Sequence, residues 1–467
     1  MPPKKRKNET ENDPAHKKGR KKLENSNGSH AAPIESDITE DGLYADFKLE
    51  APDESGELLF SGCANWDMVG RNRVPNAVKN NGGKNLYTPH RIASLQGIRI
   101  RMVVAGCSAA HLFVISTEGK VYSWGRNEKG QLGHGDTERK DKPSPVESLF
   151  TMNVVDGAVG KNHTIFLTDK GRLLSCGDNK MGQLGLGHQS NHVPSPTLVA
   201  HSGPPIKKVA CGGEFSMAVD IRGNLYSFGH PEYGQLGHNT DGKYFITSNK
   251  LAYNCELKPR KVAVFIEKSR DGTVTPVLDV EIEQIACGVN HTLACDSNKR
   301  LYTWGFGGYG RLGHAEPKNE LVPRLVKAFQ GPNQGVTQIQ CGSQFSLAVG
   351  CASQLYMWGQ QKPTGEATMY PKPVQDLSGW NIRSIGCCYK SIVVAADESV
   401  VSWGPSPTFG ELASGEPKSC TTPSESRPLE NIYIKKVACG FSHSLFLARD
   451  EEEEEKKRIA SLPVFDP

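Results

Sequence analysis

Short apolar runs recur along most of the chain and are separated by turns rich in glycine. Between about residues 57 and 450, runs of four to six apolar residues, with many β-branched and aromatic side chains, alternate with polar positions or stand unbroken. Runs of this length, bounded by glycine clusters, predict β-strands. No stretch approaches the roughly 20 apolar residues of a membrane-spanning helix. The pattern predicts an all-β protein of many short strands.

Three landmarks repeat in a fixed order within this pattern. The first is an aromatic residue and a glycine that end an apolar run, at Gly125, Gly229, Gly305, Gly359 and Gly404, with Cys or Ser in place of the aromatic residue before Gly177 and Gly62. The second is the turn Gly-Gln-Leu-Gly or Gly-Arg-Leu-Gly, which begins at Gly130, Gly182, Gly234 and Gly310, decays to GELA at Gly410 and is lost after Gly359. The third is a Cys-Gly step before an apolar run, as in VACGGEFSMAV, IACGVNHTLAC, IQCGSQFSLAV and VACGFSHSLFL, with looser copies in VVAGCSAAHLFVI, GAVGKNHTIFL and IGCCYKSIVVA.

The spacing of the landmarks indicates the size of the repeating unit. Successive glycines of the first landmark stand 63, 52, 52, 76, 54 and 45 residues apart. A base period near 52 residues with variable insertions is typical of a β-propeller blade, which holds about four short strands.

The two ends of the array complement each other. It opens with the strand ELLFSG, which has no Cys-Gly hairpin before it, and closes with the hairpin KKVACGFSHSLFLARD, which has no strand after it. Seven complete units result only if the last hairpin pairs with the first strand. We therefore predict a closed seven-bladed β-propeller whose two chain ends share one blade, which also removes exposed sheet edges.

Tails and one insertion accompany the predicted propeller. We expect a disordered tail, basic and then acidic, over residues 1–50, the propeller over 51–450 and a charged C-terminal tail over 451–467. Glu451–Glu455 and the three basic residues after them would allow a turn or two of helix, but a solvated tail is favoured. The insertion at about 238–283 carries LKPRKVAVFIEKSRDG and predicts a hairpin standing off the ring. Its cations are a candidate partner-binding prong, with a solvated hairpin as the equal alternative: Lys258, Arg260, Lys261 and Lys268.

The positive charge belongs to the N-terminal tail. The net charge is +4, while residues 1–30 carry nine basic and four acidic side chains, so the rest of the chain has a net charge of −1. Charge therefore gives no support for a nucleic-acid-binding surface on the propeller. The nine basic residues form two clusters spaced like a bipartite nuclear localisation signal: Lys4, Lys5, Arg6, Lys7, Lys17, Lys18, Arg20, Lys21 and Lys22. We expect an import receptor as their partner, with chromatin or RNA phosphates as a compatible second contact and a merely solubilising tail as the alternative.

The cysteines and the first residues of the chain indicate the cellular compartment and limit which cofactors are expected. The 13 cysteines are an odd number without a Cys-x-x-Cys pair, which argues against a disulfide framework and a zinc site. The start, MPPKKRKNET, has no apolar segment behind its charges, as a secretory signal would. We expect a reducing compartment, no metal and no cofactor.

Residues that repeat with the blades indicate packing. His111, His163, His291 and His443 share one repeat position with Phe215, Phe345 and Ser391, and exchange of His with Phe favours a structural role over that of a ligand or base. The repeated cysteines predict core positions and the repeated tryptophans interblade packing: Cys211, Cys287, Cys341, Cys387, Cys439, Trp124, Trp304, Trp358 and Trp403. GFGGYG at Gly305–Gly310 lacks the Lys-Ser/Thr of a phosphate loop and predicts a blade turn.

The landmarks resemble regulator-of-chromosome-condensation repeats. YSWG and GQLGHG four residues later, together with VACG before H-S/T-L, are similar to that family over about residues 57–450. Longer stretches, among them NWDMVGR, SWGRNEKGQLGHGDT, WGFGGYGRLGHAE and SWGPSPTFGEL, resemble its second, telophase-disc-type branch. Cys176, Cys388 and Ala413 depart from the pattern within single blades.

The resemblance implies regulation of small GTPases of the Ran, Rac or Ral class, by nucleotide exchange or by blocking other exchange factors. It also implies the nucleus and nucleolus, mitotic chromosomes, centromeres and spindle, with the cytoplasm and cytoskeleton as further places. A monomer is expected. The family's exchange residues cannot be assigned to positions of this chain. A chromosome or microtubule scaffold without exchange activity is the main alternative, and an enzyme with an axial pocket finds no clustered carboxylates or ligand spacing in the sequence.

Overall fold

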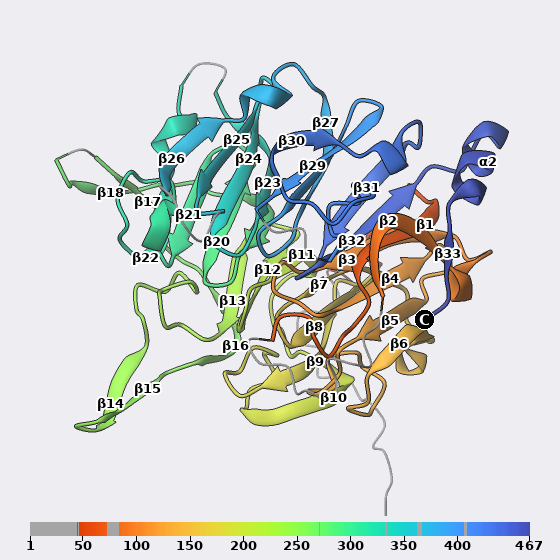
Figure 1. Ribbon diagram of the computed structural model, residues 1–467. Helices are drawn as coiled ribbons and strands as arrows, with labels where there is room; N and C mark the ends of the chain where they lie inside the picture. Colours follow the sequence, from red (N-terminus) through yellow and green to blue (C-terminus); the bar gives the residue numbers. More distant parts are fainter. Residues whose placement is uncertain are drawn as a thin grey trace, which may run out of the picture. The chain divides into compact units, whose positions relative to one another are not determined.

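The structure of the protein, a computed structural model, describes residue 44 and residues 46–71, 84–269, 271–331, 334–361, 367–405 and 409–467. Within these residues the chain is almost entirely β-sheet, with one α-helix, α2 (Glu453–Ser461), and short 3-10 turns. Seven sheets of four to six strands follow one another in a ring, and an eighth sheet of two strands projects from them (Figure 1). The described part of the chain is the seven-bladed β-propeller that the repeat predicts.

Each blade is an antiparallel sheet whose strands are named inner, second, third and outer from the axis outward. Blade 1 holds β3 (Ile100–Ala105), β4 (His111–Ser116), β5 (Val121–Gly125) and β6 (Lys140–Pro145). Blade 2 holds β7 (Val154–Val159), β8 (His163–Thr168), β9 (Leu173–Asn179) and β10 (Ser190–Leu198). Blade 3 holds β11 (Ile206–Cys211), β12 (Phe215–Asp220), β13 (Leu225–Gly229) and β16 (Glu256–Lys261).

The remaining blades follow the same plan. Blade 4 holds β19 (Ile282–Cys287), β20 (His291–Asp296), β21 (Leu301–Gly305) and β22 (Glu320–Leu325). Blade 5 holds β23 (Val336–Cys341), β24 (Phe345–Gly350), β25 (Leu355–Gly359) and β26 (Thr368–Pro373). Blade 6 holds β27 (Ile382–Cys387), β28 (Ile392–Ala396), β29 (Ser399–Gly404) and β30 (Cys420–Glu425). Blade 7 joins β31 (Ile434–Cys439) and β32 (His443–Ala448) to β1 (Glu57–Cys63) and β2 (Asn85–Ile92).

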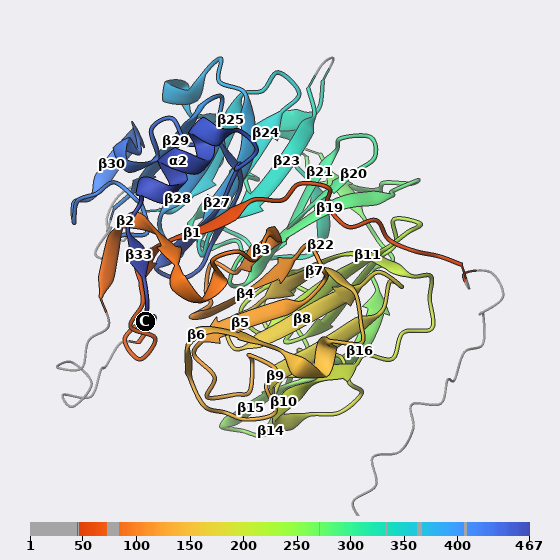
Figure 2. The ribbon, with the colours of Figure 1, turned by 90° about the vertical axis from the view of Figure 1, so that its right-hand side faces the viewer.

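The ring closes inside blade 7, where the two ends of the propeller meet. Strand β1 pairs with β32 in continuous antiparallel register, from Glu57 opposite Ala448 to Gly62 opposite His443. In Figure 2 the early strands β1 and β2 lie beside the late elements of the same blade. The predicted pairing of the first strand with the last hairpin is confirmed.

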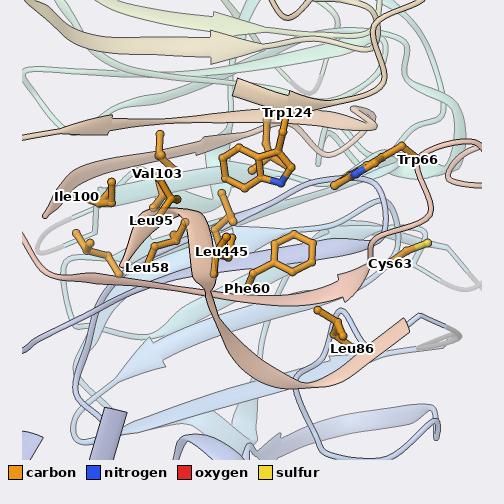
Figure 3. Close-up of a cluster of buried hydrophobic side chains, with 14 of the residues drawn as sticks. Leu58, Phe60, Cys63, Trp66, Leu86, Leu95, Ile100, Val103, Trp124 and Leu445 are labelled. Atoms are coloured by element: carbon orange, nitrogen blue, oxygen red, sulfur yellow. The ribbon is translucent and has the colours of Figure 1, made fainter. Parts of the chain in front are cut away.

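Apolar clusters between neighbouring blades form the core. The described residues contain seven such clusters, one at each junction around the ring. At the closing junction, Phe60 of β1 and Trp124 of β5 belong to one cluster with Trp66 and Leu445 (Figure 3). The four repeated tryptophans all lie in these clusters, which confirms their predicted role in interblade packing.

The Gly-Gln-Leu-Gly turn fastens neighbouring blades through two backbone carbonyls. Ser175 Oγ, on the third strand of blade 2, donates to Leu184 O at 2.8 Å, and Ser216 Oγ of blade 3 donates to Gln183 O at 2.8 Å. Equivalent bonds recur in the other blades that keep the turn, from Ser123, Ser227, Thr303 and Ser402 to the leucine carbonyl and from Thr164, Thr292, Ser346 and Ser444 to the residue before it. Each turn is therefore an interblade clasp, which explains its recurrence.

The glycine of the Cys-Gly step makes room for the ring three residues later. A Cβ on Gly212 would lie 1.9 Å from the Phe215 ring, and a Cβ on Gly440 would lie 2.1 Å from the His443 ring. In blade 6 the glycine is replaced by Cys388, and the ring position holds the small Ser391. The departure at Cys388 is thus compensated within the same turn.

The insertion differs from the prediction. Its segment LKPRK lies in β16, the outer strand of blade 3, which pairs with β13. The hairpin that stands off the ring is formed instead by β14 (Lys243–Thr247) and β15 (Lys250–Tyr253). Strands β17 (Ile266–Lys268) and β18 (Val274–Pro276) extend the outer edge of blade 4, where β17 runs parallel to β22. The prediction of a free hairpin over LKPRKVAVFIEKSRDG is wrong, because pairing with β13 takes its first half.

The C-terminal residues are not a solvated tail. Helix α2 starts with a capping box between Glu452 and Glu455, and its Ile459 is fully buried at the junction of blades 6 and 7. Strand β33 (Val464–Phe465) then pairs in parallel with β2 and adds a fifth strand to blade 7. The prediction for residues 451–467 is wrong because one well-placed apolar residue anchors a segment whose charge suggested full solvation.

The N-terminal boundary also lies earlier than predicted. Arg222 lies over the ring of Tyr44 at 5.9 Å, and Leu49 N donates to Asp169 O at 2.7 Å. Leu49 and Ala51 pack against the cluster between blades 2 and 3. Contact with the propeller therefore begins before residue 51.

Phe60→Ala in the closing strand should lower the free energy of unfolding by about 3–5 kcal/mol, because it leaves a cavity at the junction of blades 7 and 1. Denaturant-induced unfolding followed by circular dichroism measures this loss. Phe245, 72% exposed on β14, offers a matched control, and Phe245→Ala should change the stability by less than about 0.5 kcal/mol. A loss below about 1 kcal/mol for Phe60→Ala would contradict the role of the closing strand.

Candidate partner-binding face

One face of the ring carries both sequence landmarks. Because the strands are antiparallel, the inner–second turn and the third–outer loop of a blade emerge at the same end of its sheet. Backbone bonds join the two, as where Arg126 N donates to Ala110 O at 2.9 Å and His230 N donates to Glu214 O at 3.0 Å. We call this the signature face, made by the turns 106–110, 160–162, 212–214, 288–290, 342–344, 388–391 and 440–442 and by the loops that follow the third strands.

The inner turns of the signature face are hydrogen-bonded from blade to blade. Gly213 N donates to Val289 O at 2.9 Å, and Phe441 N donates to Ala109 O at 2.8 Å across the closing junction. Similar bonds run from Lys161 N to Gly213 O and from Tyr389 N to Phe441 O, both at 3.3 Å. This collar fixes the positions of side chains that come from different blades.

A cavity of about 230 Å³ lies inside the collar and is lined by the inner strands of all seven blades. The five cysteines predicted as core residues line it. Cys341, Cys387 and Cys439 are buried as expected, whereas Cys211 and Cys287 are partly exposed to the cavity. Burial raises the pKa of the Cys211 thiol to about 12 and that of Cys287 well above its ordinary value. The thiols stay protonated and are poor nucleophiles.

Three of the four repeated histidines form hydrogen bonds to the next blade, and the fourth, His443, packs on a ring of its own blade. His111 Nε2 lies 2.9 Å from Thr164 Oγ1 of the next blade, and His163 Nε2 lies 3.0 Å from Ser216 Oγ of the next blade. His291 makes the same contact with Ser346. His443 faces blade 1, where the hydroxyl position is Leu112, and its ring stacks on Phe60. Burial lowers the pKa of His111 to about 3 and that of His163 to about 4, so both are neutral at physiological pH. The structural role predicted for these histidines is confirmed.

Arg311 is a cation buried beneath the signature face, with only 2% of the residue exposed. It occupies the clasp position that is Gln in blades 1 to 3, and no carboxylate of the described residues lies within ion-pair distance of it. Its Nε donates to Gly308 O at 2.9 Å, and its guanidinium lies 4.6 Å from the centroid of the Phe306 ring and 5.8 Å from that of Tyr309. Burial lowers the pKa of Arg311 to about 10, so the side chain keeps its charge at neutral pH.

Partly exposed aromatic rings surround this cation and continue around the face. Tyr233 contacts Phe306 across blades 3 and 4 with ring centroids 4.7 Å apart, and Tyr389 stacks on Phe441 across blades 6 and 7 at 4.4 Å. Tyr309 is 47% exposed. Tyrosine rings are among the side chains that dominate protein interfaces. The signature face can therefore anchor a protein partner.

Glu411 is the second departure at the clasp position. Its side chain is buried, and Phe409 N donates to its Oε2 at 3.3 Å, just as Lys129 N donates to Oε1 of Gln131 at 2.8 Å in blade 1. Burial raises the pKa of Glu411 to about 7. A carboxyl that gains a proton near neutral pH thus stands where other blades have a neutral amide.

The candidate site residues from the sequence are not brought together. The nine basic residues of the tail lie outside the described residues. Lys258, Arg260 and Lys261 lie on β16 and Lys268 on β17, so none of them is on the projecting hairpin. Arg260 pairs with Glu256 in its own strand, and Lys268 lies 3.8 Å from Glu316 of blade 4. These cations lie on the outer edges of blades 3 and 4 and do not form a prong.

Sequence reasoning assigned no residue to the signature face. The signal that was available is departure from the repeat, because Arg311 and Glu411 replace the Gln that three blades share. The aromatic rings gave a weaker signal, because Tyr233, Tyr309 and Phe409 share the position before the turn and Tyr389 and Phe441 share the second position after the repeated cysteine, whereas the other blades with these landmarks have non-aromatic residues there.

The described residues contain no group of three or more His, Cys, Asp or Glu side chains that could hold a metal ion. In the same part of the chain, no helix is long and apolar enough to cross a membrane.

Comparison with known proteins gives the same architecture. The family model described as the RCC1-like domain matches residues 49–394. Protein RCC2 of Homo sapiens is 55% identical over 424 residues, which are 90% of this chain and 81% of the relative. Prp20p of Saccharomyces cerevisiae, whose crystal structure was described together with its binding properties to Gsp1p and histones, has a TM-score of 0.67 at 19% identity, over 91% of this chain and 98% of Prp20p. The structure of Kap60 bound to Prp20, yeast RCC1, matches with a TM-score of 0.65 at 19% identity, over 95% of this chain and 99% of that one.

Glu411→Gln should stabilise the protein above pH 7. The pKa of Glu411 rises from an ordinary value near 4.5 to about 7 on folding, so the folded state holds the proton more tightly and loses stability as the pH rises through this range. The amide removes this cost, which amounts to at most about 3 kcal/mol. Unfolding by denaturant at pH 4.5 and pH 8 should give an advantage for the variant at pH 8 only. Glu128→Gln, an exposed change on the same face, is the control, and an equal difference at both pH values would contradict the prediction.

Proposed function

The chain belongs to the RCC1-like family, and on this premise we propose that it regulates small GTPases by binding them on the signature face, without covalent catalysis. The observation that carries the proposal is the group of rings above the buried Arg311, in which Tyr309 is 47% exposed and Phe306 and Tyr389 are partly exposed. Phe306 and Tyr309 come from blade 4 and Tyr389 from the collar turn of blade 6, so a partner meets a surface that is built on two blades before it binds.

Nucleotide exchange requires only differential binding by such a surface. If the signature face binds a nucleotide-free GTPase more tightly than the loaded form, the nucleotide is bound more weakly in the complex by the same factor. No nucleophile or general base is needed, which suits a face whose repeated histidines are neutral and buried. A face that binds both forms equally would shift no equilibrium, and would instead block other exchange factors.

Membership of the family supports a proposal for the class of the GTPase. Prp20p, which shares the fold, is described with its binding properties to Gsp1p, and this supports a GTPase partner for this chain. We propose a partner of the Ran, Rac or Ral class and roles in cell-cycle, mitotic and cytoskeletal control. A chromosome or microtubule scaffold without exchange activity remains the second candidate, favoured by the basic tail.

Tyr309→Ala combined with Tyr389→Ala should weaken binding to a nucleotide-free GTPase at least tenfold, because both rings are proposed interface anchors. The purified chain is titrated against immobilised, nucleotide-free Ran, Rac and Ral, and release of labelled GDP is then followed for any GTPase that binds. Phe150→Ala, 49% exposed and outside the signature face, is the matched control and should bind as the wild type does. Accelerated release means exchange, and binding without acceleration means blocking. Failure of the wild-type chain to bind any of the three would overturn the proposal.

We propose that the basic tail directs the chain into the nucleus and nucleolus, and in mitosis to chromosomes, centromeres and spindle. The two basic clusters support it, and a yeast relative, Prp20, is the partner of Kap60 in a solved complex. Contact with chromatin or microtubules is a second proposed use of the same charges.

Alanine at Lys17, Lys18, Arg20, Lys21 and Lys22 should abolish nuclear accumulation of the full chain in living cells and leave GTPase binding unchanged, because none of the residues that form the signature face is altered. Fluorescence imaging and the titration above measure the two properties. The control exchanges each of these residues between Lys and Arg and should accumulate normally. Unchanged accumulation of the alanine variant would contradict the role of the tail.

A further inference from the structure

Ser55 stands where the chain enters the closing blade. The chain before β1 contacts blade 3 through Tyr44, blade 2 through Leu49 and blade 1 through Gly56, and then joins blade 7 (Figure 2). Gly56 N donates to Ile100 O at 2.9 Å, and Ile100 N donates back to Gly56 O at 3.0 Å. This bridge fixes Ser55 at the junction of blades 7 and 1, on the side of the ring opposite the signature face.

Cations from both of these blades contact Ser55. Arg99, which precedes β3 of blade 1, donates from Nε and Nη2 to Ser55 Oγ at 3.3 and 3.1 Å. Lys435, on β31 of blade 7, donates from Nζ to Ser55 O at 2.9 Å. Among the described residues, Ser55 is the one serine whose hydroxyl accepts a hydrogen bond from an arginine side chain. Ser55 thus lies against two cations that come from different blades.

Arg99 has one bidentate edge that no acid occupies. Its Nη1 and Nη2 atoms donate to the two carboxylate oxygens of Asp450 at 3.0 and 2.9 Å. The other edge, Nε and Nη2, meets only the Ser55 hydroxyl. A phosphate is a stronger acceptor than a neutral hydroxyl, because its charged oxygens can take two parallel hydrogen bonds from such an edge. A phosphate on Ser55 Oγ can therefore take this edge while Asp450 keeps the other.

The acidic side chains around Ser55 are already neutralised. Three carboxylates lie near it, and each is paired with a cation: Asp450 with Arg99, Glu451 with Lys435 and Glu54 with Lys436. Pairing weakens their repulsion of a further anion, whereas Arg99 and Lys435 would contact the phosphate directly.

The segment that carries Ser55 is accessible to an enzyme. Residues 51–55 belong to no strand or helix, Asp53 and Glu54 are exposed, and Ser55 itself is partly exposed. Glu57 stands at the second position after the serine. Because acidic side chains flank the target on both sides, a kinase that binds this segment needs a basic substrate groove.

We propose that Ser55 is a phosphorylation site for an acid-directed serine kinase and that its phosphate locks the ring by binding Arg99 beside blade 1 and Lys435 of blade 7. In the transfer, Ser55 Oγ forms a bond to the γ-phosphorus of ATP while the bond from that phosphorus to the β–γ bridging oxygen breaks. ADP leaves, and the hydroxyl proton passes to the base of the kinase. The phosphate then holds both cations across the closing junction and leaves the signature face unobstructed.

The first test measures whether the cations hold the phosphate. Full-length protein with genetically encoded phosphoserine in place of Ser55 is titrated by ³¹P NMR, beside protein with phosphoserine in place of the exposed Ser202. Two cations beside the phosphate should make its second pKa at least about 0.5 lower than that of the Ser202 phosphate. Arg99→Gln should remove most of this difference, whereas Arg172→Gln, an exposed change in blade 2, should keep it. Equal pKa values for the two phosphates would overturn the proposal.

Hydrogen exchange of the same proteins measures the lock. The amides of Gly56 and Ile100 bridge the junction and should exchange at least about threefold more slowly when Ser55 carries phosphate, the factor that matches a pKa difference of about 0.5. Arg99→Gln should abolish this protection. Faster exchange would mean that repulsion by Asp450 dominates, and it would overturn the lock.

A kinase assay on the unmodified full chain tests access to the site. A polo-type kinase, which favours an acidic residue shortly before its target, is supplied with ATP, and the phosphorylated residues are mapped by mass spectrometry. Thr39 follows Asp37 at the same spacing as Ser55 follows Asp53, so it shows whether the kinase is active. Phosphate at Ser55 supports the proposal, and phosphate at Thr39 without phosphate at Ser55 overturns it.

Discussion

Contact between neighbouring blades is the constraint on which the rest of the structure depends. No blade can bury its apolar surface alone, and the seven clusters of the core each take side chains from two blades. The clasp adds directional bonds to this packing, since a hydroxyl of one blade meets a carbonyl presented by the blade before it. The landmarks recur because each of these contacts must be made again at every junction.

The need for contact between neighbouring blades explains which parts of the fold could be predicted from the sequence. The turn, the Cys-Gly step and the aromatic-Gly pair each serve a contact that recurs in most blades, so the sequence repeats wherever the structure does. The pairing of β1 with β32 followed from the same logic, because a ring leaves no unpartnered blade. Of the segments that were misjudged, helix α2 has no counterpart in other blades and depends on one apolar residue, Ile459, among charged neighbours. LKPRK does have counterparts in the outer strands of the other blades, but the long insertion before it separates it from β13 in the sequence and hid their pairing.

The candidate site lies where single blades differ from the others. The repeated residues of a propeller pack its blades against one another, so a binding surface must come from positions where a blade departs from the repeat. Arg311 and Glu411 are such departures, and both were visible in the sequence as replacements for Gln. A hairpin standing off the ring was predicted for the insertion, but it was placed on LKPRKVAVFIEKSRDG and not on β14–β15. Its place depends on which part of the insertion joins the sheet, and this is decided by pairing across the blade.

Because blade 7 combines strands from both ends of the propeller, it also constrains how the protein folds during its synthesis. Its third and outer strands are synthesised first and its inner and second strands last, and Ser61 Oγ reaches the carbonyl of Gly410 across 349 residues. During translation, β1 and β2 cannot pair with β31 and β32, which are synthesised last. The incomplete ring therefore exposes apolar surface on the blade at each of its two ends. A message that ends prematurely would leave this surface uncovered for good, and such a product is a natural substrate for chaperones and proteases.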